Sequence, residues 1–130
     1  MGSVVIIGGG VTGIQAALDL ANHGVRVHII EREPSLGGHM AQLDKTFPTN
    51  DCSMCILSPK MLDVCRHPDV VIHTCSEVKK IEGQKGHFLV TVRKNPRFVD
   101  EDLCNGCGDC IRICPVEVYN RFDAGIGVRK

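Results

Sequence analysis

A glycine motif that follows an apolar segment near the N-terminus, together with a compressed run of four cysteines near the C-terminus, predicts an α/β protein in two parts. Residues 1–97 are expected to form a Rossmann-like nucleotide-binding fold. Residues 98–130 are expected to form the start of a ferredoxin-type iron-sulfur domain. The hydrophobic content of 43% is sufficient for a packed core.

The first elements of the nucleotide-binding part follow from hydrophobic spacing. Residues 3–7 are mostly apolar and β-branched, which predicts a strand buried on both faces of a parallel sheet. Apolar residues then recur at helical spacing: Val11, Ile14, Ala17, Leu18 and Ala21. Gly24 is expected just beyond the end of this helix, and a second buried strand is expected over residues 25–30.

The loop between the first strand and the helix has the form G-x-G-x-x-G. Gly8 allows a tight turn, Gly10 lets a pyrophosphate approach the backbone, and Gly13 lets helix and strand pack closely. The pyrophosphate would lie against the free N–H groups of the helix. Glu31 ends the second strand, where a carboxylate accepts hydrogen bonds from ribose hydroxyls and disfavours NADP. A glycine-rich turn without a ligand is the alternative, but the surrounding elements favour the nucleotide site.

The segment after Glu31 indicates which dinucleotide binds. Gly37 and Gly38 follow Glu31 in a pattern that resembles the two-dinucleotide-binding flavoproteins, whose first fold holds FAD. This resemblance favours FAD over NAD. The residues expected to contact FAD lie in the glycine loop and after the second strand: Gly8, Gly10, Val11, Thr12, Gly13, Glu31, Arg32 and Gly38.

Three further strands are expected in the first part. Residues 70–73 read as a third parallel strand, and residues 77–81 and 88–92 as two strands joined by a turn. Side chains of the last strand alternate between two sets, Phe88, Val90, Val92 and Leu89, Thr91, Arg93. This alternation predicts one buried face and one more exposed face.

The second part contains the cysteine run C-x2-C-x2-C-x3-C-P, formed by Cys104, Cys107, Cys110 and Cys114. Thiolates at this spacing can bind a [4Fe-4S] cluster, and Gly106 and Gly108 let the backbone curl around the inorganic sulfurs. Pro115 turns the chain away from the cluster. The spacing predicts these four cysteines as cluster ligands.

Two alternatives concern this run. A zinc site with four thiolates is one, but such sites use two C-x-x-C elements separated by a longer loop. The other concerns Cys114, because the fourth cysteine of such a run ligates the other cluster in two-cluster ferredoxins. Cys114 therefore either completes this cluster or ligates a second cluster together with a partner motif beyond Lys130. The partner motif is the favoured interpretation.

Cys52 and Cys55 form a C-x-x-C pair after the two adjacent glycines. Three interpretations stay open: a redox pair beside the flavin, ligands of a further cluster, and ordinary packing. A thiol at a helix N-terminus ionises more readily, and such a helix could begin here, although Pro59 is expected to interrupt it. Cys65 and Cys75 are expected to be buried and inert.

Charge and hydropathy limit the functional classes. The 15 basic and 15 acidic side chains give a formal net charge of zero, which predicts no long-range attraction to nucleic acid or to an anionic membrane. The apolar segment near the N-terminus is too short to span a bilayer, and no basic segment precedes it as in a signal peptide. A cytoplasmic protein is therefore expected, in which 8 cysteines indicate metal or redox chemistry.

Taken together, the residues resemble the flavin and iron-sulfur (A) component of heterodisulfide reductase along essentially the whole chain. The most specific segments are GGHMAQLDKTFPTNDCSMC at residues 37–55 and the cysteine run followed by NRFDAG at residues 120–125. In that family a thioredoxin-reductase-like module binds FAD and is interrupted by an inserted ferredoxin domain. The resemblance implies a chain that stops within this insert, so a fragment with little activity of its own is expected.

The resemblance also implies a function in the electron transfer of methanogenesis. The flavin would take electron pairs and, in many members, split them between ferredoxin and a branch that reduces the mixed disulfide of coenzymes M and B on another component of the complex. Heterodisulfide reductase subunits B and C, ferredoxin, and a hydrogenase or formate dehydrogenase are the implied partners. The alternative function is a non-catalytic scaffold whose nucleotide fold and structural metal site serve the assembly of a complex.

Overall fold

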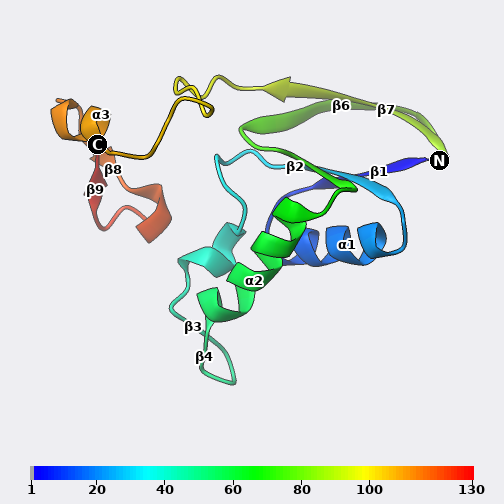
Figure 1. Ribbon diagram of the computed structural model, residues 1–130, viewed down its shortest axis with the longest axis horizontal. Coiled ribbons are helices and arrows are strands. Elements are labelled where there is room, and N and C mark those ends of the chain that lie inside the picture. Colours follow the sequence, from blue (N-terminus) through cyan, green and yellow to red (C-terminus); the bar gives the residue numbers. More distant parts are fainter. Residues whose placement is uncertain (1) are drawn as a thin grey trace. The chain divides into compact units, whose positions relative to one another are not determined.

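The computed structural model describes residues 2–130 and divides the chain into two compact units, Met1–Arg97 and Phe98–Lys130 (Figure 1). The first unit contains a parallel sheet with two long helices and an antiparallel hairpin. The second unit contains one short helix and two short strands. Among the described residues, no helix is both long enough and apolar enough to cross a bilayer.

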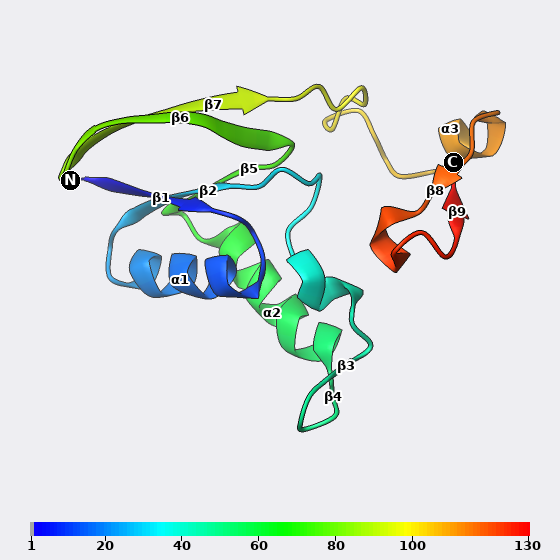
Figure 2. The same ribbon diagram turned by 180° about the vertical axis from the view of Figure 1, so that it is seen from behind.

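The sheet of the first unit has the strand order β1-β2-β5, and all its strands are parallel. Its members are β1 (Ser3–Ile7), β2 (Arg26–Ile30) and β5 (Val70–His73). The helices α1 (Val11–Asn22) and α2 (Ser53–Arg66) lie on one side of this sheet, and the hairpin lies on the other side (Figures 1 and 2). The strands and helix expected at these positions are confirmed.

The core forms where α1 and α2 pack on the sheet. Its buried residues come from these elements and one loop: Ile14, Ala17, Ala21, Val27, Ile29, Leu36, Leu57 and Val64. The helical spacing in α1 and the alternation in β2 place these apolar side chains on one side of each element. Gly24 ends α1 as expected: with φ +78° it donates its N–H to Ala21, while Val25 donates to Leu20.

The first strand is not buried on both faces, which corrects the prediction. In β1 only Ile6 packs against the core, and Ile7 is 62% exposed. The reason is topological, because β1 is an edge strand of the described sheet and β2 lies at the centre. A short apolar run identifies a strand but does not say which strands lie beside it.

Pro59 does not interrupt α2, which also differs from the prediction. The helix continues from Ser53 to Arg66 with Pro59 inside it. Pro59 has no N–H for the carbonyl of Cys55, four residues earlier. Both residues are exposed, so this carbonyl can bond to water instead. A proline is tolerated here because the bond it removes lies at the surface.

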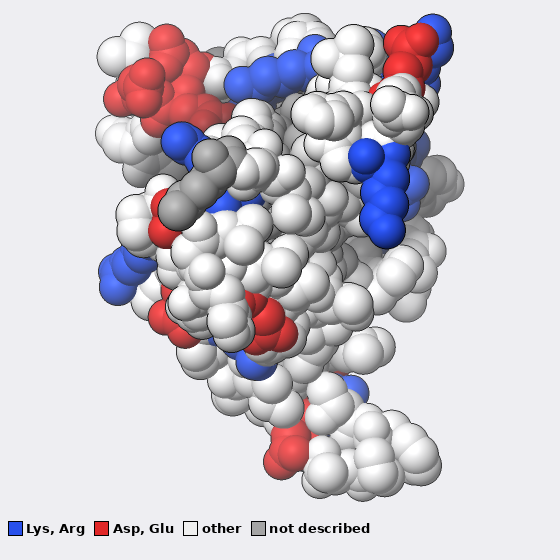
Figure 3. All heavy atoms as spheres, turned by 90° about the vertical axis from the view of Figure 1, so that its right-hand side faces the viewer, with Lys and Arg blue, Asp and Glu red and all other residues white. Residues whose placement is uncertain are grey.

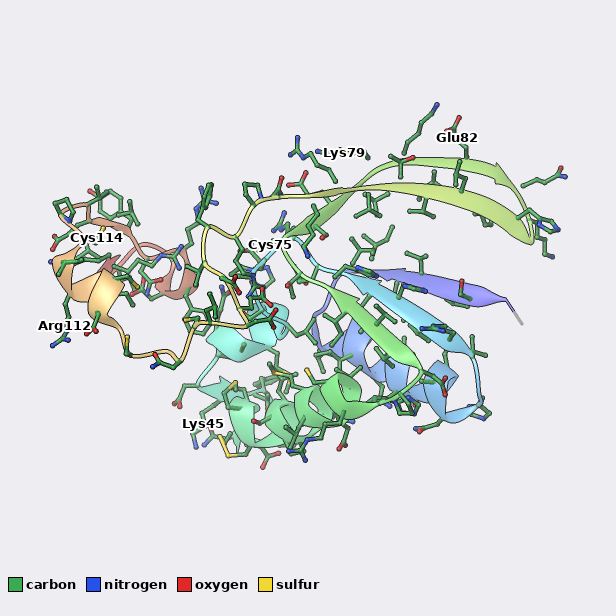
Figure 4. All side chains as sticks on the ribbon, turned by 45° about the horizontal axis from the view of Figure 1, so that its top comes forward. Lys45, Cys75, Lys79, Glu82, Arg112 and Cys114 are labelled. Atoms are coloured by element: carbon green, nitrogen blue, oxygen red, sulfur yellow. A yellow bond between two sulfur atoms is a disulfide. The ribbon has the colours of Figure 1, made fainter. Side chains whose placement is uncertain are left out.

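The hairpin is longer and more exposed than expected. It consists of β6 (Ser76–Gln84) and β7 (His87–Lys94), which pair antiparallel. Phe88 is 62% exposed and Leu89, on the opposite face, is 66% exposed, so the prediction of one buried face is wrong. The reason is that β6 and β7 form a separate two-stranded sheet. Lys79 and Glu82 point away from the parallel sheet (Figure 4).

The second unit has α3 (Asp109–Ile113), the strand pair β8 (Val118–Tyr119) and β9 (Val128–Arg129), and a 3-10 turn, η2 (Arg121–Asp123). Asp123 supports the turn between the strands, because its carboxylate accepts hydrogen bonds from the N–H groups of Gly125 and Gly127. Within residues 98–130 no side chain is buried. The hydrophobic effect therefore contributes little to the fold of this unit.

Charged side chains of both signs are interspersed with uncharged ones on the face shown in Figure 3. Two ion pairs of the first unit share Glu77, which contacts Lys79 at 2.6 Å and Arg93 at 3.2 Å. The hydrogen bond from Lys79, and its charge, lower the pKa of the Glu77 carboxyl. The mixture of signs agrees with the zero formal net charge of the sequence.

Two histidines stack on the side of the sheet away from the helices. The rings of His28 and His73 are 5.5 Å apart at 15°, and Nδ1 of His28 lies 3.2 Å from Nε2 of His73. Burial, then the charges of His28 and Lys94, lower the pKa of His73 below its ordinary value of 6.5. At this spacing the two rings disfavour carrying a proton each.

We expect the first unit to lose stability as the pH falls below about 6.5, the ordinary histidine value. The unfolded chain then binds a proton that folded His73 resists, so the stabilising contribution is present above this pH and is lost toward the lower pKa of the folded state. Urea unfolding between pH 8 and pH 5 measures this. A His73→Gln variant should show a flatter profile, whereas His87→Gln, at the exposed start of β7, should keep the wild-type slope.

Candidate functional site

The glycine loop between β1 and α1 requires glycine at two positions, one because of its backbone angle and one because there is no space for a side chain. Gly8 has φ +103°, a value that other residues rarely adopt. Gly13 lies against this turn, and a Cβ atom there would overlap the carbonyl oxygen of Gly8. These two residues thus have the turning and packing roles that the motif predicts.

The N-terminal end of α1 is open to a ligand. Gly10 is the N-cap, and no described side chain caps it or places a carboxylate in the first turn. The N–H groups of Val11, Thr12 and Gly13 precede the first helical hydrogen bond, which runs from Ile14 to Gly10. They belong to the lining of a hollow of about 440 Å³, which also includes Gly8 and Gly10 and extends to His39 and Met40.

The second glycine pair, Gly37 and Gly38, packs against this loop. Gly37 donates its N–H to the carbonyl of Gly9 at 2.8 Å and forms a parallel bridge with Gly10. Gly38 has φ +56° and begins the 3-10 turn η1 (Gly38–Gln42). A Cβ at Gly38 would lie 3.0 Å from the Cα of Gly10. The segment that the sequence associates with FAD therefore lies beside the glycine loop.

Glu31 has a contact that the sequence did not predict. Its side chain is buried, with 7% exposure, and it accepts the N–H of Gly9 at 2.6 Å and the N–H of Glu33 at 2.9 Å. Each carboxylate oxygen has a second lone pair for a ribose hydroxyl. Glu31 thus fixes the glycine loop in addition to its predicted role. Arg32 is exposed and pairs with Glu33 at 3.5 Å.

These observations fit a dinucleotide cofactor. The loop supplies uncapped N–H groups and glycines without side chains at the place of closest approach, which suits a pyrophosphate. Glu31, bonded to the same loop, supplies a carboxylate for the adjacent ribose. The donor set on this side of the first unit is therefore appropriate for the cofactor that the sequence predicts.

A Glu31→Gln variant is expected to lower the free energy of unfolding by about 1–3 kcal/mol. The carboxamide can accept one of the two backbone N–H groups, but it then directs its NH2 group at the other donor. Urea unfolding followed by circular dichroism measures the change. Glu33→Gln is the matched control, because that side chain is exposed; equal losses in the two variants would contradict the anchoring role of Glu31.

The four cysteines of the second unit lie on a short, tightly turned segment. Gly106 and Gly108 have φ +73° and +79°, and Gly108 caps α3, which carries Cys110. Cys114 caps the other end of α3 and is half-buried, whereas the other three predicted ligands are exposed. The glycines provide the curled backbone that the motif predicts.

The structure does not bring these thiols together. Within residues 2–130, no three His, Cys, Asp or Glu side chains are grouped closely enough to hold a metal ion. Small metal domains commonly assemble their ligand set only through the metal–thiolate bonds. Four thiols at this spacing fit a [4Fe-4S] cluster by donor chemistry, and Cys104, Cys107, Cys110 and Cys114 remain its predicted ligands.

Cys52 and Cys55 form a disulfide at the start of α2, with their Cα atoms 5.3 Å apart. Cys52 is the N-cap of the helix, and its Sγ accepts the N–H of Cys55 at 3.2 Å. Ser53 is fully buried and anchors the segment, because its hydroxyl donates to the carbonyl of Leu43. Sequence patterns did not single out Ser53, since a serine between two cysteines carries no periodic signal.

The remaining cysteines differ from the expectation of buried thiols. Cys65 is exposed near the C-terminal end of α2. Cys75 is half-buried, between β5 and β6, with φ +51°. The buried interpretation is thus wrong for Cys65, because this residue lies on the side of α2 away from the core.

Two family sequence models match the chain. The family described as FAD dependent oxidoreductase matches residues 3–53, and the family described as 4Fe-4S binding domain matches residues 98–119. These matches confirm the predicted cofactors, FAD and a [4Fe-4S] cluster. The iron-sulfur match does not favour the alternative of a zinc-containing scaffold.

Curated relatives cover nearly the whole chain. The sequence is 60% identical over 126 residues to an iron-sulfur A component of the CoB–CoM heterodisulfide reductase of Methanopyrus kandleri, which covers 97% of this chain and 19% of the relative. It is 58% identical over 128 residues to the corresponding component from Methanocaldococcus jannaschii, covering 98% and 20%. The A component of the H2/formate:CoB-CoM heterodisulfide,ferredoxin reductase of Methanococcus maripaludis is 52% identical, covering 98% and 20%. The chain thus spans about a fifth of the length of these relatives.

Solved structures agree with the predicted fold class. L-proline dehydrogenase from P. horikoshii superimposes with a TM-score of 0.59 at 30% identity, covering 69% of this chain and 18% of that chain. A structure described as a thioredoxin reductase from Bacillus anthracis gives a TM-score of 0.52 at 19% identity, covering 70% and 31%. The prediction of a Rossmann-like α/β fold with an iron-sulfur segment is confirmed.

Proposed function

The chain is a homologue of the iron-sulfur A component of heterodisulfide reductase along 97% of its length, and from this premise we propose that it is the flavin and iron-sulfur electron-transfer module of an oxidoreductase of that type. One observation carries the proposal: an FAD oxidoreductase match and a 4Fe-4S match occur in the same short chain. FAD would supply a carrier of electron pairs and the cluster a carrier of single electrons.

The residues of the chain have positioning roles in this proposal. The N–H groups of Val11, Thr12 and Gly13 would bind the FAD pyrophosphate, and Glu31 would bind a ribose hydroxyl while it holds the glycine loop. Gly38 would keep the neighbouring turn close to the loop without a side chain in between. Exposed Arg32 is proposed to approach the cofactor from the surface.

The cysteines have two roles in the proposal. Cys104, Cys107, Cys110 and Cys114 are the proposed thiolate ligands of the cluster. Cys52 and Cys55 are proposed as a redox-active pair, supported by their disulfide at the start of α2. The turn η1 begins at Gly38 of the second glycine pair, and two short antiparallel strands, β3 (Lys45–Thr46) and β4 (Asp51–Cys52), lead from it to Cys52.

The names of the relatives support a proposal about partners. We propose that the protein works in a complex with heterodisulfide reductase subunits B and C and exchanges electrons with ferredoxin and with a hydrogenase or formate dehydrogenase. Two relatives are named for H2 and ferredoxin as well as for the heterodisulfide, and one of them is also named for formate. Splitting of electron pairs between ferredoxin and the heterodisulfide branch is part of this proposal, as is a cytoplasmic location.

Anaerobic reconstitution with FAD, iron and sulfide tests the proposed function. We expect a brown protein with about one FAD and about four iron atoms per cluster, whose flavin and cluster absorbances both bleach on reduction. Light-driven reduction of the flavin should be followed by reduction of the cluster in the same sample. A colourless protein that takes up stoichiometric zinc would overturn the proposal and favour a structural scaffold.

A further inference from the structure

The two cysteines of the disulfide have different surroundings. Cys52 is half-buried, caps α2 and accepts the N–H of Cys55 through its Sγ. Cys55 is exposed in the first turn of α2. An external thiol can therefore reach the sulfur of Cys55 more easily, whereas the sulfur of Cys52 has a better environment for a negative charge.

A cation lies next to Cys52. The strands β3 (Lys45–Thr46) and β4 (Asp51–Cys52) pair antiparallel, with Lys45 directly opposite Cys52. Directly opposed residues project from the same face of such a ladder. Figure 4 shows Lys45 beside the N-terminal end of α2. Of the nearby carboxylates, Asp51 opposes Thr46 on the other face, and Asp44 precedes the ladder.

The exposed side of α2 forms an open hollow beside Cys55. Its volume is about 620 Å³, and its other lining residues are mostly apolar: Ser58, Pro59, Met61, Leu62 and Cys65. Leu62 is 48% exposed, one helical turn beyond Ser58. The sulfur-bearing residue Cys55 and an apolar surface that can contact an aliphatic chain therefore line the same hollow.

We propose that an external aliphatic thiol bound along this hollow attacks the disulfide at the sulfur of Cys55, and that Cys52 is the thiolate released by the exchange. This inference deepens the proposed redox role of the pair. The external thiol loses its proton to solvent, and its thiolate attacks Sγ of Cys55. A mixed disulfide forms on Cys55, the bond between Cys55 and Cys52 breaks, and its electron pair remains on Cys52. The more stable thiolate is the better leaving group.

Rapid-quench mass spectrometry of the oxidised full chain tests the site of attack. The probes are 6-mercaptohexanol and 2-mercaptoethanol, which differ by four methylene groups. We expect the mixed disulfide on Cys55 rather than Cys52, by about ten to one, and a rate about tenfold higher with the longer thiol, because the hollow removes methylenes from water. Adducts mainly on Cys52, equal rates for the two probes, or an oxidised chain without this disulfide would each overturn the proposal.

A pair of variants separates binding in the hollow from general reactivity. Leu62→Ser should remove the preference for 6-mercaptohexanol, so that this variant reacts with the two probes at similar rates. Ile56→Ser is the matched control, because Ile56 is a similarly exposed apolar residue of α2 outside the lining of the hollow. A preference that survives in Leu62→Ser, or disappears equally in both variants, would contradict the assigned hollow.

Alkylation of single thiols tests the assignment of Cys52. Iodoacetamide reaction with Cys52 in Cys55→Ser, and with Cys55 in Cys52→Ser, is followed by peptide mass spectrometry across a pH series. The midpoint for Cys52 should lie about one pH unit lower. Lys45→Gln should raise it, while Lys85→Gln, in the exposed hairpin turn, should not; a higher midpoint for Cys52 would overturn the proposal. These measurements need neither FAD nor iron, so their failure is distinguishable from failure of the proposed function.

Discussion

A Gly13→Val variant is expected to lose FAD binding and much of the stability of the first unit. A side chain at this position would overlap the carbonyl oxygen of Gly8, so either α1 moves away from β1 or the tight turn opens. Overpacking against backbone should lower the free energy of unfolding by about 3 kcal/mol. Because both movements displace the N–H groups proposed to bind the pyrophosphate, FAD affinity should fall by about 100-fold or more, which corresponds to about 2.7 kcal/mol.

Flavin fluorescence titration and urea unfolding measure the two effects separately. Gly2→Val is the matched control, since a Cβ at Gly2 would meet nothing within 4 Å. It should retain both the affinity and the stability of the unmodified chain. Wild-type FAD affinity in Gly13→Val would contradict the assignment of this loop as the pyrophosphate site.

A Cys107→Ala variant is expected to lose the iron-sulfur cluster completely. The second unit has no buried side chain, so nothing except the thiolates can retain the cluster after a ligand is removed. After anaerobic reconstitution, iron should fall from about four atoms per cluster to near zero, and the broad visible absorbance should disappear. The flavin of the same sample should remain, because the glycine loop lies in the other unit.

Cys65→Ala is the matched control for iron content. Cys65 is an exposed thiol in α2, outside the cysteine run, and its removal should leave both iron and absorbance unchanged. Full iron content in Cys107→Ala, or equal losses in the two variants, would show that the run does not ligate the cluster.

The elements of the first unit were predictable because their signals are local. The spacing of apolar residues in α1, the glycine at its end and the β-branched runs of β2 and β5 each determine a conformation without reference to distant residues. Gly8 and Gly13 were predictable for a related reason, since the motif specifies backbone conformation rather than a partner.

Burial and contacts were less predictable because they depend on what packs against an element. Ile7 has the sequence context of a buried strand, but β1 lies at the edge of the described sheet. Phe88 alternates as if one face of its strand were covered, but the hairpin forms its own sheet. The bond between Glu31 and the N–H of Gly9 joins residues 22 positions apart, which no periodic pattern can indicate.

The absence of any buried side chain in residues 98–130 means that an apolar core does not hold this segment folded. A domain with an apolar core can remain folded after it loses its cofactor and can bind the cofactor again. If the four cysteines bind the cluster, iron–thiolate bonds would constrain this segment in place of an apolar core, and loss of the cluster is expected to make the segment more sensitive to proteases.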